Sequence, residues 1–237
     1  MPAAPIKKPT LADLRLWIGD EESERYGSDR AAMEKIVFAQ ATGNGAGSLW
    51  CDFMEWCAGD AAFLRMCAWV FAKMPENAEK PGIMMSAFEL AAGKHFLKAA
   101  SWLVKNGLDL RSPLSSDGAA LHVASVYRRP AVVKLLLSKG CDPNAPNGDG
   151  KPPLFLMLLN LGQYEEGGLF PVSHSRALET AKLLVGAGAK LEAKIGRKKE
   201  SAIALASGPL KAWLESLEIR KGAGEGAALP KLGRRKF

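Results

Sequence analysis

Between residues 118 and 150, the order of apolar and polar positions predicts two short helices followed by an extended loop. We expect the first helix at residues 120–126 and the second at residues 131–138, with a turn between them that ends in Pro130. Apolar side chains wrap more than one face of the second helix, at positions 132, 133, 135, 136 and 137. A helix with this pattern is buried on two sides, as happens when pairs of helices stack on one another.

The same pattern recurs along the chain with a period of 33 residues. Phe88, Leu121 and Leu154 are each 33 residues apart, and so are Gly107 and Gly140. A fixed period of this length is typical of repeat proteins, in which each unit contacts only its neighbours. The period therefore predicts an array of stacked helix pairs.

This repeat resembles the ankyrin repeat. The T-P-L-H-x-A signature of that family has degraded forms at residues 119–124 and 152–155, and its V-V-x-L-L-L-x-x-G-A run is nearly intact at residues 132–141. The resemblance is strong from about residue 86 to residue 206 and weak outside that stretch. It implies an all-α fold, an ankyrin-repeat solenoid of four to five helix pairs with an N-terminal helical cap region.

The sequence divides into three predicted parts. Residues 1–47 are expected to form an N-terminal helical cap segment, which ends in a glycine-rich connection. Residues 48–220 are expected to form the repeat array, whose first and last units diverge as terminal units of a solenoid do. About 15 residues are added to the array near residues 161–175, in a predicted loop. Residues 221–237 form a basic tail that we expect to be disordered.

The net charge of +7 is concentrated in two segments. Residues 190–200 contribute +3 and residues 221–237 contribute +4, so the rest of the chain is neutral. Local basic segments on a neutral body are weaker evidence for nucleic-acid binding than a basic stripe along a face. Nucleic-acid binding stays an alternative, and it would use Arg197, Lys198, Lys199, Arg234, Arg235 and Lys236.

Signals for an enzyme, a metal site or a cofactor are poor. The four cysteines show no C-x-x-C spacing, and the three histidines lie in different repeat units. None of the glycine-rich stretches follows a strand and opens a helix with the lysine that a phosphate loop needs. The family resemblance gives His122 a structural role, hydrogen bonding between neighbouring loops. We therefore expect no catalytic residue, no metal and no cofactor.

Cysteine usage and hydropathy indicate a cytoplasmic protein. All four cysteines lie in apolar helical surroundings, which favours free thiols of a reducing compartment. No apolar run approaches the ~20 residues that a membrane-spanning helix needs. The N-terminal lysines are not followed by the apolar stretch of a secretory signal. We expect a monomer without a membrane segment.

The resemblance also implies where a partner would bind, at the loop tips and the outer ends of the first helices. Tyr127, Arg128 and Arg129 form the sharpest cluster, because Tyr and Arg are enriched at binding hot spots; the alternative is that they only solvate a turn. In the insertion, the acidic Glu165 and Glu166 precede the apolar Leu169 and Phe170, which could contact a partner. The alternative is that the apolar side chains pack back on the array. The predicted partner-binding residues are Lys94, Ser115, Ser116, Asp117, Tyr127, Arg128, Arg129, Asp149, Lys151, Asn160, Tyr164, Glu165 and Glu166.

The expected activity is binding another protein through the concave loop and helix face. Since each unit repeats one orientation, we expect Tyr127 and Arg128 to lie near Asp149 and Lys151 on that face. A repeat array without catalytic residues acts by occupying its partner, which slightly favours an inhibitor or immunity-type antagonist. The alternatives are an adaptor scaffold and the nucleic-acid binding described above.

Overall fold

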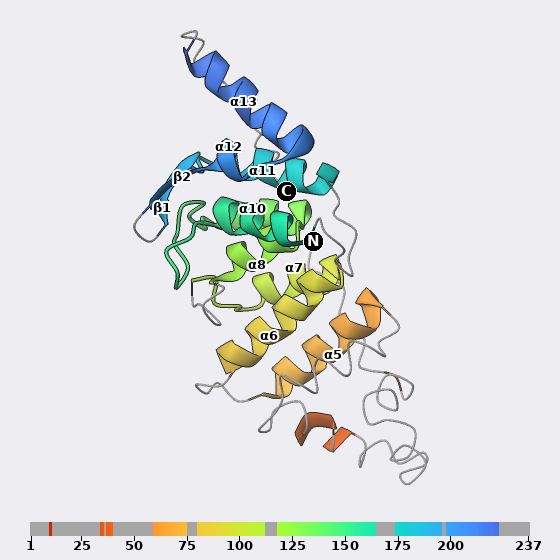
Figure 1. Cartoon of the computed structure of the whole chain (residues 1–237). Coiled ribbons are helices and arrows are strands. Elements are labelled where there is room, and N and C mark those ends of the chain that lie inside the picture. The colour runs from red at the N-terminus through yellow and green to blue at the C-terminus, as the bar shows by residue number, and fades with distance from the viewer. Residues whose placement is uncertain are drawn as a thin grey trace. The chain divides into compact units, whose positions relative to one another are not determined.

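The chain folds into two compact units, Met1–Leu110 and Arg111–Phe237, both built from helices (Figure 1). This computed structural model describes residues 10, 34–35, 37–39, 59–74, 80–111, 118–164, 174–195 and 198–222. Within these residues, strands occur only in one short hairpin of the second unit. The predicted all-α fold of stacked helix pairs is confirmed.

Among the described residues after residue 58, the first unit contains α5 (Asp60–Lys73), α6 (Lys80–Gly93) and α7 (Leu97–Lys105). α6 and α7 make one helix pair, and α5 packs on both of them. Phe63, Phe88 and Leu103 from the three helices are fully buried between them. The helices are short, so this shared apolar core supplies the stability that each would lack alone.

Part of the N-terminal segment packs on α5. Residues 34–35 and 37–39 are helical, and Val37 is fully buried. The ring of Phe38 meets the ring of Trp69 edge-on, with centroids 6.1 Å apart. Burial of Val37 and Phe38 against the array covers apolar surface that a terminal repeat would otherwise expose.

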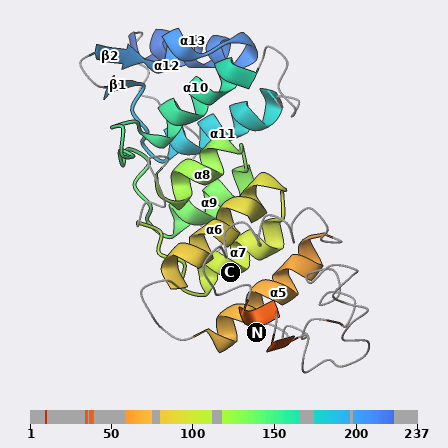
Figure 2. The ribbon, with the colours of Figure 1, turned by 60° about the horizontal axis from the view of Figure 1, so that its bottom comes forward.

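Helix pairs stack in the second unit as they do in a repeat solenoid. Its elements are α8 (Ala120–Val126), α9 (Pro130–Ser138), α10 (Pro153–Tyr164), α11 (His174–Gly186), β1 (Glu192–Ile195), β2 (Lys198–Ser201), α12 (Ala202–Leu205) and α13 (Gly208–Gly222). The first helices of the pairs pack in the order α8, α10, α12, and the second helices in the order α9, α11, α13 (Figure 2). β1 and β2 pair antiparallel in the loop that precedes α12, with Glu192 opposite Ser201.

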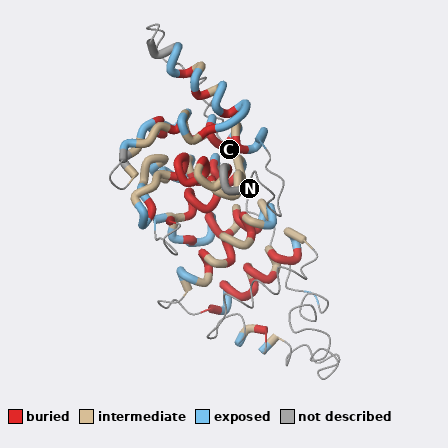
Figure 3. Tube along the Cα trace, in the orientation of Figure 1, coloured by how far each residue is buried: buried red, intermediate tan, exposed pale blue. Residues whose placement is uncertain are grey.

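Buried residues line the faces that successive pairs present to one another (Figure 3). α9 contributes Val132, Val133 and Leu136, all of them fully buried. In α13, the last helix of the described residues, Leu210, Leu214 and Leu217 are buried, as expected for a helix that covers the apolar face of the preceding pair. The apolar pattern of the sequence therefore identified the packing faces correctly.

The three predicted parts of the chain remain predictions. Most of the cap segment and the basic tail beyond residue 222 lie outside the described residues. Of the insertion near residues 161–175, α10 covers the beginning and α11 the end, and residues 165–173 lie outside the described part.

A carboxylate from α5 caps the start of α7. The backbone N–H of Lys98 donates to Asp60 Oδ2 (2.8 Å), and that of Ala99 donates to Asp60 Oδ1 (2.9 Å). The first N–H groups of a helix have no partner within the helix, and a negative charge near them is favourable. Asp60 therefore links α5 and α7, the second helices of two successive repeats, through one side chain.

We expect the Leu136→Ala substitution to lower the free energy of unfolding by ~2–5 kcal/mol, because it leaves a cavity between stacked pairs. Leu136 is fully buried in α9. Lys134→Ala on the exposed side of the same helix is the control and should cost less than ~0.5 kcal/mol. Denaturant titration followed by circular dichroism measures both. Equal, small losses would contradict the packing of α9.

Asp60→Ala should destabilise the first unit by ~1–2 kcal/mol, because two helix N–H groups lose their acceptor. Asp60→Asn keeps one acceptor oxygen and should cost less. Asp109→Ala, in an exposed position of the same unit, controls for the loss of one negative charge. The same titration distinguishes the variants, and an Asp60→Ala loss no larger than that of Asp109→Ala would show that the cap is not formed.

Candidate functional site

The loop between α9 and α10 is held in place by His122, near the start of α8. Its Nε2 lies 3.0 Å from the carbonyl oxygen of Ala145 and 3.2 Å from that of Lys151. Carbonyl oxygens only accept, so Nε2 carries the proton and donates to this pair of acceptors. The side chain is buried, with 1% of its surface exposed. The structural role that the ankyrin resemblance implied for His122 is confirmed.

Asn147 organises the tip of the same loop from within. Its side-chain Oδ1 accepts from the backbone N–H groups of Asp149 (3.0 Å) and Lys151 (2.8 Å). Its own N–H donates to the carbonyl of Lys151 (3.0 Å). Asn147 is buried, while Asp149 is exposed and Lys151 half-buried. The loop therefore presents the side chains of Asp149 and Lys151 from a fixed backbone.

Gly118 permits this close approach of loop and helix. Its φ of 98° lies in the left-handed region, where glycine meets no steric penalty. A Cβ atom at this position would lie 2.7 Å from Cγ of His122 and 2.8 Å from Cβ of Asn147. The glycine is thus required both by its backbone angle and by the two side chains that hold the loop.

Asn144 connects this loop to the corresponding loop of the next repeat. Its Nδ2 donates to the carbonyl of Gly188 (2.9 Å), and its Oδ1 accepts from the N–H of Lys190 (2.8 Å). A side chain that satisfies one acceptor and one donor fixes the spacing of successive loops. The loop between α9 and α10 is therefore tied to the loop that follows α11.

The turn between α8 and α9 carries Tyr127, Arg128 and Arg129. The N–H of Arg128 donates to the carbonyl of Ser125 (3.0 Å), and that of Arg129 donates to the carbonyl of Ala124 (2.9 Å). This pair of bonds is a Schellman cap, in which the left-handed residue is usually glycine. Here that residue is Arg128, with φ 53°. All three side chains of the turn are half-buried.

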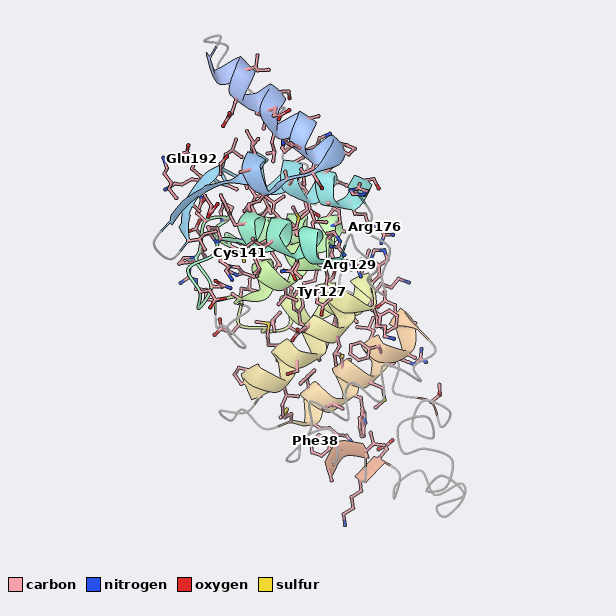
Figure 4. All side chains as sticks on the ribbon, in the orientation of Figure 1. Phe38, Tyr127, Arg129, Cys141, Arg176 and Glu192 are labelled. Carbon is pink, nitrogen blue, oxygen red and sulfur yellow. The ribbon has the colours of Figure 1, made fainter. Side chains whose placement is uncertain are left out.

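The expectation that Tyr127 and Arg128 lie near Asp149 and Lys151 is wrong. The loop contacts His122 in the first turn of α8, whereas Tyr127 follows the last residue of that helix. Five residues of helix separate the two contacts by about 8 Å along the axis. In Figure 4, Tyr127 and Arg129 accordingly lie toward one edge of the second unit and Cys141 toward the other. The predicted residues therefore lie on two surfaces. The loop surface carries Asp149 and Lys151, and the turn surface carries Tyr127, Arg128 and Arg129.

The other predicted binding residues fall on these two edges or outside the described part. Lys94 is exposed at the turn between α6 and α7. Asn160 lies in α10, where its side-chain amide donates to the carbonyl of Leu156 (2.9 Å), and Tyr164 ends that helix. Five residues lie outside the described part: Ser115, Ser116, Asp117, Glu165 and Glu166.

Residues of the nucleic-acid alternative come mostly from parts that the structure does not describe. Arg197, Arg234, Arg235 and Lys236 lie outside the described residues, and Lys198 begins β2. Lys199 is exposed and forms an ion pair with Glu192 across the hairpin. That pairing offsets one of the positive charges on which the alternative depends.

Arg176 is a third arginine at the turn edge, and it was not among the residues predicted from the sequence. It lies in the first turn of α11, next to Arg129 in Figure 4. The insertion before α11 breaks the 33-residue register and hides the correspondence. The 48 residues between Gly140 and Gly188 restore it, because the same offset carries Arg128 to Arg176.

The described residues show no grouping for metal or covalent chemistry. Within the described ranges, no three His, Cys, Asp or Glu side chains gather to hold a metal ion. Cys67 is buried and Cys141 half-buried, both as free thiols, while Cys51 and Cys57 lie outside the described part. Burial raises the pKa of Cys141, which disfavours the reactive thiolate. Within those same ranges, no helix has the length and apolar character needed to cross a membrane.

Comparison with known proteins supports the repeat assignment. Residues 65–147 match the family described as Ankyrin repeats (3 copies). The match begins within α5 and ends at the loop that His122 holds, so it confirms the ankyrin resemblance and extends it to the divergent first repeat. Ankyrin repeats are protein-interaction modules, and this stretch is one.

Part of the chain is also similar to a curated protein. The chain is 38% identical over 76 residues to palmitoyltransferase AKR1 of Naumovozyma castellii. The aligned stretch is 32% of this chain and 10% of that protein, so the chain spans about a tenth of the relative's length.

The buried imidazole of His122 predicts a specific pH dependence. Burial lowers the pKa of His122 below its ordinary value of 6.5, against the opposing effect of the carbonyl groups of Lys151 and Ala145. The folded chain therefore binds fewer protons than the unfolded chain as the pH falls through 6.5. Stability from the neutral imidazole is complete above that pH and is lost as the pH falls toward the folded-state pKa.

We expect the free energy of unfolding to fall more steeply in the wild type than in His122→Gln between neutral and mildly acidic pH. The glutamine amide can donate to one loop carbonyl but does not titrate. Denaturant titrations at a series of pH values give the two slopes, and His174→Gln, at an exposed position, is the control. Identical slopes in wild type and His122→Gln would contradict a neutral, buried imidazole.

Proposed function

We propose that this chain binds another protein through its loop surface and acts by occupying that partner, as an inhibitor or immunity-type antagonist. The match to ankyrin repeats supports the protein-binding role. The observation that carries the choice of surface is the network of His122 and Asn147, which fixes the loop backbone around Asp149 and Lys151. A surface that is ordered before binding loses little entropy when a partner arrives.

The proposed loop surface consists of residues 142–151. Asp149 and Lys151 form an ion pair at 3.0 Å, with 54% and 27% of their side chains exposed. A partly exposed ion pair contributes little to stability, so both charges are available to a partner at low cost. Asn144 and its bonds to the next loop extend the same rigid surface along the array.

Inhibition is favoured over an adaptor role because it needs only one binding surface. A rigid array that holds one partner can block that partner's site without moving or reacting. An adaptor needs a second surface that holds a second partner at the same time. The nucleic-acid alternative is less favoured, because Lys199 already pairs with Glu192.

Exchanging the two loop charges tests the proposal. The double variant Asp149→Lys, Lys151→Asp keeps the net charge, the internal ion pair and the backbone bonds of the loop, but it reverses the charges that a partner meets. We expect a loss of affinity of about tenfold or more, since misplaced charges at an interface are repulsive. The immobilised full chain would first capture its partner from nuclease-treated lysate, and titration with the purified partner would then give both affinities.

Lys134→Ala with Lys139→Ala, at exposed positions within α9 and directly after it, is the matched control and should change the affinity less than about threefold. Inhibition is then read from the partner's own activity, which should fall to a saturable minimum as the chain is added. Unchanged activity in the saturated complex would indicate an adaptor. Binding that survives the charge exchange but not the control variant would place the partner on the other side.

A further inference from the structure

The hairpin of the second unit has one strand edge without a neighbour. β1 and β2 pair with each other in a two-stranded sheet. The chain just before β1 is tied to the preceding loop, because the side chain of Asn144 bonds to the backbone of Gly188 and Lys190. In Figures 1 and 2, β1 accordingly lies on the side of that preceding loop and β2 on the side of α13. Among the described residues, the outer edge of β2 has no strand beside it.

The register shows which backbone groups of β2 point outward. Glu192 lies opposite Ser201, and one step further the N–H of Ala202 donates to the carbonyl of Leu191 (2.7 Å). In an antiparallel pair, hydrogen-bonded and non-hydrogen-bonded positions alternate. Ala202 occupies a hydrogen-bonded position, so Ser201 and Lys199 occupy the other kind. The N–H groups of these two residues and the carbonyl of Lys199 therefore point away from β1.

These outward groups form a short row along one edge. Among the described residues, no backbone or side-chain group accepts from the N–H of Lys199 or of Ser201. The hydroxyl of Ser201 accepts from the N–H of Ile203 and caps α12, which leaves the Ser201 N–H as it is. The row reads donor, acceptor, donor. An edge with this pattern is a template for a further strand.

A second copy of the chain is a poor occupant of this edge. Two β2 strands related by a two-fold axis run antiparallel, and Lys199 must then take a hydrogen-bonded position. Only two registers within β2 meet this condition, one centred on Lys199 and one centred on Glu200. Each places two like charges directly opposite one another, which is destabilising in a sheet. The edge therefore favours a strand of different sequence.

Charge selects the chemistry of that strand. Residues 190–200 contribute +3, and Lys199 has 73% of its side chain exposed. The ion pair of Lys199 with Glu192 is exposed on both sides and contributes little to stability, so Lys199 can meet a second carboxylate at low cost. The chain's own residues 221–237 contribute +4 and do not complement this charge. An acidic segment of another protein does.

We propose that the outer edge of β2 takes up an extended acidic segment of a partner protein as a third, antiparallel strand, with a carboxylate opposite Lys199. Lys199 then makes two backbone bonds to one partner residue, and Ser201 donates a further N–H. The inference rests on the proposed protein-binding role and adds the hairpin to the loop surface, to which Asn144 ties it. Lysine on an edge strand of four residues repels basic strands, so it restricts the edge to acidic ones.

Nucleic acid fits this edge less well. Phosphate oxygens accept hydrogen bonds but do not donate them, so a row of phosphates would leave the carbonyl of Lys199 without a donor. An extended peptide offers N–H and carbonyl groups in alternation along its edge. The order of donor and acceptor on β2 therefore favours a peptide.

The experiment uses the full chain and a fluorescein-labelled peptide of alternating threonine and glutamate, which places glutamate opposite Lys199 and threonine opposite Glu200. Fluorescence anisotropy at low ionic strength should show saturable binding, and the threonine–lysine peptide should not bind. Methylating the backbone nitrogens of the glutamates should weaken binding about tenfold or more, because those N–H groups face β2. Methylating those of the threonines should weaken it less than about threefold, because they face away. Equal effects of the two methylations would reduce binding to charge and overturn the proposal.

Two substitutions at Lys199 separate the backbone from the charge. Lys199→Gln removes the charge and keeps the N–H, whereas Lys199→Pro removes both. Proline is tolerated at outward positions of an edge strand, and circular dichroism confirms folding. We expect Lys199→Pro to weaken the peptide at least about fivefold more than Lys199→Gln does. Equal affinities of the two variants would overturn the proposal, and the methylated peptides test the same bond in the wild type if Lys199→Pro unfolds.

Lys134→Gln, at an exposed position of α9, is the matched control and should weaken the peptide by less than about threefold, since distant exposed charges are screened. A loss as large as that of Lys199→Gln would reduce the role of Lys199 to net charge and overturn the proposal. Sedimentation of the chain at rising concentration should show no dimer that Lys199→Pro abolishes, because such a dimer would assign the edge to a second copy. Tighter binding of a single-stranded oligonucleotide of equal charge would overturn the proposal as well.

The two proposals fail separately. If the wild-type chain does not bind the threonine–glutamate peptide but still captures a protein through the loop surface, the strand edge is wrong and the proposed function stands. If the peptide binds as expected but no protein survives nuclease treatment on the immobilised chain, the proposed function fails while the strand edge is retained.

Discussion

The hydrogen bonds of His122 to the carbonyls of Ala145 and Lys151 determine which residues of the second unit lie at the start of α8 and which lie at its end. They tie the long loop to the first turn of α8, so everything that the loop presents lies at the start of that helix. The turn with Tyr127, Arg128 and Arg129 then follows its end. Two surfaces with different side chains result: a loop surface with Asp149 and Lys151 on a hydrogen-bonded backbone, and a turn surface with Tyr127, Arg128 and Arg129.

The repeat architecture was predictable because its cause is local and periodic. A helix with apolar residues on two faces, such as α9, must be buried on two sides, and a 33-residue period supplies the neighbours that bury it. His122 could be identified from its place in a degraded signature. Asn147 could not, since a buried asparagine in a polar loop has the same sequence appearance as an exposed one.

The composition of the candidate site was predicted less well than the fold. The 33-residue period indicates that each repeat has the same orientation. Whether the turn residues lie near the loop residues also depends on the direction in which each helix runs. Tyr127 and Lys151 are separated because α8 runs between their contacts. Arg176 was missed for another reason: the insertion shifts its register, and only the glycines that end α9 and α11 reveal which residues correspond.

The contrast between Asp60 and Arg176 shows how one backbone arrangement can serve opposite purposes. In both units a second helix begins one turn early and brings a charged residue to the start of its neighbour. The Asp60 carboxylate accepts hydrogen bonds from N–H groups at the start of α7 and so contributes to stability. Arg176 adds to a positive helix end that Arg129 and Arg128 already reinforce. The same extension of a second helix therefore contributes to stability in the first unit and brings like charges together in the second.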